Sequence, residues 1–66
     1  MTYEETLRKA ITTQTHQIFK GENSLWELHF IPVGNGRVRQ IGMNGNGNIE
    51  YGCLHALNEN GEVILV

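Results

Sequence analysis

The chain has 66 residues and a formal net charge of −2, from five Lys and Arg against seven acidic residues, all of them Glu. This length excludes a second domain of ordinary size, and the slightly acidic balance argues against general nucleic-acid binding, which leaves a strongly basic footprint. The single cysteine, Cys53, excludes an intrachain disulfide. Together with a polar, acidic start, it leads us to expect a cytoplasmic protein. No apolar run approaches the roughly 20 residues of a membrane span, so we expect no membrane partner.

A helix is predicted over residues 3–19. Thr2 is the expected N-cap, and Glu5 three residues later completes a capping box. The threonines at 12, 13 and 15 lower helix propensity, so packing rather than propensity would stabilise this helix. The packing face is predicted by residues at helical spacing, namely Tyr3, Leu7, Ala10, Ile11, Gln14 and Ile18.

Beyond the helix the hydrophobic period changes to two, which predicts four strands over about residues 25–32, 37–43, 49–57 and 62–66. Turns rich in Asn and Gly separate these strands, and both residue types adopt positive φ readily. Short connections join antiparallel neighbours. The sequence therefore predicts one α+β domain over residues 1–66, with the helix packed on a four-stranded antiparallel meander. Trp26, Leu28 and Phe30 are the simplest face for the helix to cover.

The register of the predicted sheet is less certain than its topology. In the second strand, Val38 conflicts with Ile41 and Met43 unless a bulge intervenes. In the third strand, alternation predicts a common face for Ile49, Tyr51, Cys53, His55 and Leu57. Both faces of the sheet are apolar, and one helix covers only one of them. We therefore expect a homo-oligomer, with a two-fold dimer favoured.

Catalytic and metal-binding motifs are not recognisable in the sequence. Cys53 with His55 or His29 is the best candidate for a soft metal site or a Cys–His nucleophile. Its spacing matches no zinc signature, and a mid-strand position in so small a domain offers little concavity for a substrate. We therefore expect neither an enzyme nor a bound metal or other cofactor.

One candidate ligand site combines arginines, an aromatic ring and a glycine-rich loop. Arg37 and Arg39 share a strand face, and an indole near them would form a surface that stacks nucleotides. Backbone N–H groups of the loop after residue 43 could cradle an anion. The candidate ligand-binding residues are Trp26, Arg37, Arg39, Asn44, Gly45 and Asn46.

These patterns favour a small, non-enzymatic, self-associating binding module that acts as an inhibitor or accessory factor of a protein partner. The alternative is a binder of a small anionic or nucleotide-like ligand at a subunit interface. The sequence names neither the partner nor the ligand.

Overall fold

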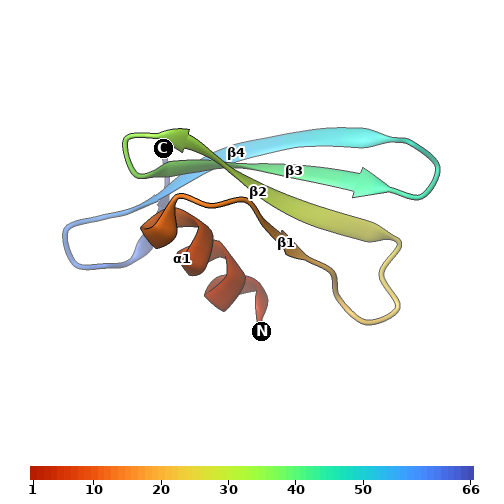
Figure 1. The fold of residues 1–66 in the computed structure, drawn as a ribbon, viewed down its shortest axis with the longest axis horizontal. Helices are drawn as coiled ribbons and strands as arrows, with labels where there is room; N and C mark the ends of the chain where they lie inside the picture. The colour runs from red at the N-terminus through yellow and green to blue at the C-terminus, as the bar shows by residue number, and fades with distance from the viewer.

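The computed structural model of the protein describes residues 1–66 as one helix followed by five strands. The elements are α1 (Tyr3–Thr13), β1 (Gln17–Phe19), β2 (Trp26–Gly34), β3 (Arg37–Asn44), β4 (Ile49–Leu57) and β5 (Val63–Leu65). The strands form one antiparallel sheet in chain order, and α1 lies against one side of it (Figure 1). The predicted α+β meander is confirmed, with five strands in place of four. The helix lacks the length and apolar character needed to span a bilayer.

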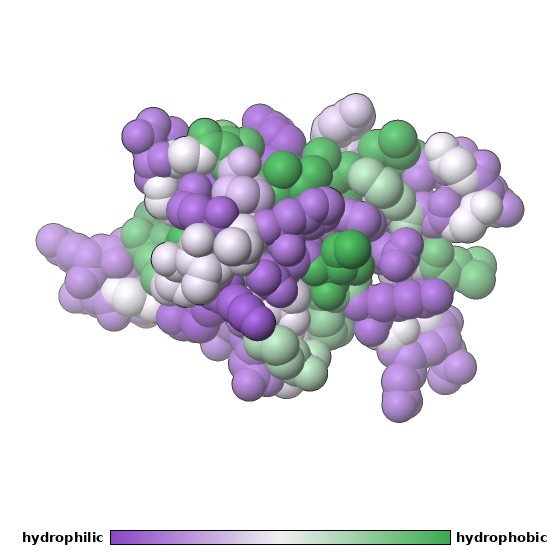
Figure 2. Space-filling model, viewed as in Figure 1, coloured by the Kyte–Doolittle hydropathy of each residue, from purple (hydrophilic) through white to green (hydrophobic).

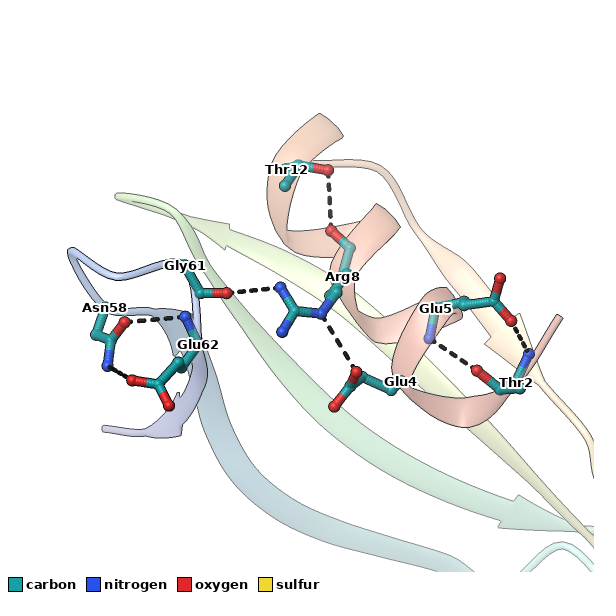
Figure 3. A network of polar contacts seen from close by, with 8 residues as sticks. All are labelled: Thr2, Glu4, Glu5, Arg8, Thr12, Asn58, Gly61 and Glu62. Atoms are coloured by element: carbon teal, nitrogen blue, oxygen red, sulfur yellow. Dashed lines mark hydrogen bonds and ion pairs between the residues drawn. The ribbon is translucent and has the colours of Figure 1, made fainter.

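The start of α1 confirms the predicted capping box. The Glu5 N–H donates to Thr2 Oγ1 at 3.2 Å, and the Thr2 N–H donates to Glu5 Oε1 at 2.9 Å. Further along, Arg8 forms an ion pair with Glu4 and donates from Nη1 to the Gly61 carbonyl at 2.6 Å. These contacts tie the exposed side of the helix to the turn between β4 and β5 (Figure 3).

The predicted extent of the helix is wrong, because α1 ends at Thr13 instead of residue 19. Gln14 adopts a left-handed conformation with φ 51°, and its side-chain Nε2 donates to the Ile11 carbonyl at 3.1 Å. Phe19 then pairs with Leu28, so residues 17–19 form the extra strand. β-branched threonines weaken the last turn of a helix, whereas the ladder with β2 buries Phe19 against the core.

The core lies between α1 and the middle of the sheet. The face of β2 that carries Leu28 and Phe30 packs toward α1, as predicted, and Phe30 is fully buried. The Tyr3 ring packs edge-on against Phe30 with ring centroids 5.5 Å apart. Only five hydrophobic residues are buried, and they are Leu7, Ala10, Ile11, Phe30 and Val38.

A bulge in β2 decides which residues of β3 face the helix. Asn35 and Gly36, with φ 57° and 71°, form a two-residue hairpin turn between β2 and β3. The register then shifts between Pro32 and Gly34, which leaves Val33 without a partner. A one-residue shift moves every side chain to the other face. Val38 therefore faces α1, while the odd-numbered residues of β3 face away from it, and β3 itself is regular.

A second bulge divides β4. Ile41 pairs with Tyr51, whereas Arg39 pairs with Leu54, so one residue of β3 is opposite two residues of β4. Tyr51 consequently faces away from α1, while His55 faces the helix. The prediction of one common face along this strand is wrong, because the extra residue reverses the alternation.

Candidate functional site

The side of the sheet that α1 does not cover, called here the open face, carries apolar side chains on all five strands. Hydrophobic residues gather along the upper side of the molecule in Figure 2, over β4 and away from α1. Ile18 is 51% exposed and Tyr51 is 73% exposed. The cross-strand pairs assign to this face the apolar residues Ile18, Ile31, Ile41, Met43, Ile49, Tyr51, Leu54, Ala56 and Ile64.

A few polar groups interrupt the open face. His16 Nε2 and His29 Nδ1 lie 2.9 Å apart, and the second ring nitrogen of His29 is buried without a partner. Arg39 donates from Nη1 to the Gly52 carbonyl at 3.3 Å. Glu27 carries a negative charge and pairs with Met43, whereas Arg39 pairs with Ile31 further along β2. The open face therefore combines an apolar centre with the acidic Glu27 at one end and the basic Arg37 and Arg39 at the other.

A second candidate surface is a depression of about 180 Å³ on the helix side of the sheet, called here the Trp26 depression. Glycine creates part of this space. A Cβ at Gly42 would lie 3.3 Å from Trp26 Cε3, and a Cβ at Gly52 would lie 2.9 Å from the Gln40 carbonyl oxygen. The depression is lined by Trp26, Leu28, Gln40, Gly42, Glu50, Tyr51 and Gly52.

The formal charge of the Trp26 depression is negative. Glu50 is exposed and supplies the only formal charge among the lining residues. Gln40 Oε1 accepts a hydrogen bond from the Tyr3 hydroxyl, which connects the lining to the first turn of α1. Burial raises the pKa of Tyr3, so this hydroxyl keeps its proton. Electrostatics in this depression therefore favour a cation over an anion.

A single chain does not assemble the ligand site predicted from the sequence. Trp26 and Asn44 are cross-strand partners, as that site requires. Arg37 and Arg39, however, flank the buried Val38 in β3 and lie on the opposite side of the sheet from the indole. The bulge in β2 produces this separation. The arginine-plus-indole site stays a prediction that requires a second chain.

The glycine-rich loop is closed by its own hydrogen bonds. Asn44 Oδ1 accepts from the N–H groups of Asn46 and Asn48 at 2.9 and 3.1 Å. The Gly47 N–H donates to the Asn44 carbonyl at 3.1 Å. Gly45 is exposed and nothing lies within 4 Å of the position of its absent Cβ. The N–H groups of Asn44, Asn46, Gly47 and Asn48 are thus engaged within the turn.

The cysteine and histidines considered above as a metal or nucleophile site lie apart. Cys53 is exposed in the bulge of β4. His55 is 8% exposed and faces α1, whereas His29 lies on the open face. No set of three or more His, Cys, Asp or Glu side chains is close enough together to hold a metal ion.

Sequence reasoning did not identify four residues of the Trp26 depression, namely Gln40, Gly42, Glu50 and Gly52. Gln40 and Gly42 share a face with Trp26 because of the register shift in β2. Glu50 pairs with Gly42, and Gly52 lies at the bulge of β4. The isolated glycines within predicted strands were the one available signal, since such glycines mark bulges or close approaches. No family model, curated protein or solved structure matches the chain.

Proposed function

We propose that the protein is a small, non-enzymatic binding module that self-associates as a two-fold dimer through its open face. The observation that carries this proposal is the apolar character of that face across all five strands, while α1 covers only the other side. Monomeric soluble proteins rarely expose contiguous apolar patches of more than a few hundred Å². An antiparallel sheet with one solvated face normally alternates between apolar and polar residues more cleanly than this one.

The dimensions of the open face suit a dimer interface. Strands of nine residues are about 30 Å long, and five strands about 4.8 Å apart are about 24 Å wide. The outer strands are short, so the planar area lies between about 400 and 700 Å². Side-chain relief enlarges this area toward the roughly 800 Å² that each partner buries in a standard interface. Dimerisation would also supplement a core of only five buried hydrophobic side chains.

Glu27 and Arg39 of the open face form a self-complementary pair. Glu27 and Arg39 lie toward opposite ends of the face, because they pair with Met43 and Ile31 respectively. In a two-fold interface, a contact from one residue to another is repeated in the reverse direction. A two-fold axis across the strands would bring Glu27 of each chain toward Arg39 of the partner subunit. This pairing favours a second copy over an unrelated apolar partner.

The edges of the sheet are less suitable than its face for association. β1 and β5, the outermost strands, have three residues each. β4 extends beyond β5, but the bulge at Gly52 and Cys53 interrupts its ladder. Pro32 lies in one of the two stretches of β2 that β1 does not pair with, and it has no N–H to donate. Short strands, bulges and proline all discourage pairing with another chain.

Light scattering over a range of protein concentrations tests this proposal. We expect the unchanged chain to form a dimer. In Ile18→Lys and Ile49→Lys, which place charges on the open face, the dimer should dissociate at higher protein concentrations. Each of these isoleucines is 51% exposed, so the folded chain tolerates lysine there. Leu25→Lys is the matched control, because Leu25 is 80% exposed in the loop before β2.

A charge reversal distinguishes the two-fold dimer from non-specific association. Glu27→Arg and Arg39→Glu alone should each weaken the dimer, and the double variant should restore it. A monomer at millimolar concentration would overturn the proposal. Equal weakening by Leu25→Lys would also overturn the assignment of the interface to the open face.

A further inference from the structure

The Trp26 depression lies on the other side of the sheet from the proposed dimer interface, so it remains open in the dimer. Its lining includes the Trp26 indole and the Glu50 carboxylate, which is its one formal charge. The six-membered ring of Trp26 lies over Gly42, within 3.6 Å of the position a Cβ would take there. A site with an aromatic wall and a carboxylate recognises a cation by two effects that add, cation–π attraction and ionic hydrogen bonding.

The shape and hydration of a cation decide how well it fits against the Trp26 indole. A guanidinium group is flat and weakly hydrated, and it stacks on aromatic faces while its N–H groups donate to a carboxylate. A primary ammonium is a compact, strongly hydrated charge. It must lose part of its hydration shell to contact an indole. The combination of Trp26 and Glu50 therefore favours guanidinium over ammonium.

The arginines of the chain itself are engaged elsewhere. Arg8 contacts Glu4 and the Gly61 carbonyl, and Arg39 contacts the Gly52 carbonyl from the open face. Arg37 lies on the same side of the sheet as Arg39. No arginine of the same chain therefore occupies the depression.

We infer that the Trp26 depression binds the arginine side chain of a partner polypeptide, with the guanidinium against the Trp26 indole and hydrogen-bonded to the Glu50 carboxylate. This site extends the proposed module from self-association to recognition of a basic partner. It does not depend on the dimer, since Trp26 and Glu50 lie on the side of the sheet opposite to the open face.

The test is a titration of the folded protein that is monitored by ¹H–¹⁵N NMR spectra. The probes are blocked tripeptides with the sequence Gly-X-Gly, in which X is arginine, lysine or citrulline. The arginine peptide should shift the Trp26 indole N–H resonance and the amide resonances of Gly42 and Gly52 saturably at millimolar concentration. The lysine peptide should bind more weakly, and citrulline, which keeps the shape but lacks the charge, should not bind. Ethylguanidinium measures binding of the free group, without a polypeptide backbone.

Two variants locate the contact. Glu50→Gln should weaken arginine-peptide binding about tenfold, because it removes the only charge in the lining. Glu59→Gln is the matched control, since Glu59 is exposed in the turn between β4 and β5. Equal effects of the two variants would mean that only the overall charge matters, and would overturn the site.

Three other outcomes contradict the inference. Equal shifts with arginine and citrulline peptides would show that charge is not recognised. Saturable shifts of the same resonances with inorganic phosphate would show an anion site. Shifts with ethylguanidinium but not with the peptide would assign the depression to a small free cation instead of a polypeptide. None of these results bears on the solution mass, so this inference and the proposed dimer fail independently.

Discussion

Asn44 and Asn58 close the last two turns of the sheet with the same four hydrogen bonds. In each turn the side-chain Oδ1 accepts two backbone N–H groups, two and four residues further on. The main chain of each asparagine also bonds to the residues three and four positions later. Gly47 and Gly61, with φ 83° and 79°, occupy equivalent positions. The two turns share one design, so the extra glycine at position 45 is not needed for it.

The side-chain carbonyl of Asn58 should therefore contribute measurably to stability. Asn58→Ala leaves the N–H groups of Asn60 and Glu62 without their acceptor, and we expect it to lower the free energy of unfolding by about 1 to 2 kcal/mol. Asn44→Ala should have a comparable effect through the equivalent bonds. Urea unfolding followed by tryptophan fluorescence measures both. Asn60→Ala is the control, and a loss as large as that of Asn58→Ala would contradict the explanation.

The buried histidine predicts a loss of stability in mild acid. His55 lies under α1 with Nδ1 unpartnered, and burial lowers its pKa below the ordinary value of 6.5. The unfolded chain therefore binds a proton more readily than the folded chain. Stability is complete above about pH 6.5 and falls as the pH decreases toward the lowered pKa, by at most about 1.4 kcal/mol per pH unit.

Replacement of this histidine isolates its contribution. His55→Leu removes the titrating group and the unpartnered nitrogen, so the free energy of unfolding should depend less on pH between 5 and 7. At pH 6 the variant should be more stable than the natural chain by about 1 kcal/mol. An unchanged slope in His55→Leu would show that another group controls it.

The glycine in the bulge of β4 should tolerate no side chain. A Cβ at Gly52 would lie 2.9 Å from the backbone oxygen of Gln40, which is closer than van der Waals contact allows. We expect Gly52→Ala to destabilise the protein by about 1 to 3 kcal/mol, in the range of other overpacked sites. Gly45→Ala is the matched control, because nothing lies within 4 Å of that position. Thermal unfolding of both variants checks this pair, and equal midpoints would contradict the crowding at Gly52.

The bulge in β2 explains why the sequence predicted one surface and the structure has another. Trp26 was expected near Arg39, but Val33 shifts the register and places these side chains on opposite sides of the sheet. The indole then faces Gly42 and Glu50 across β3 and β4. One unpaired residue therefore changes the charge of the pocket beside Trp26 from the predicted positive to negative.

The sequence by itself determined the features that depend on residues within four positions of one another. The capping box of Thr2 and Glu5, the hairpin turn at Asn35 and the turns at Asn44 and Asn58 follow from short-range hydrogen bonds and positive φ. The antiparallel order of the strands follows from the short connections between them.

Only the tertiary structure decided where the helix ends and which residues share a face. Residues 17–19 leave the helix because pairing with β2 outweighs a weak helical propensity. The faces of β3 and β4 depend on bulges whose positions are set by packing against α1 and neighbouring strands. Since one residue of register moves every side chain across the sheet, a surface built from several strands is decided by long-range packing and not by local sequence.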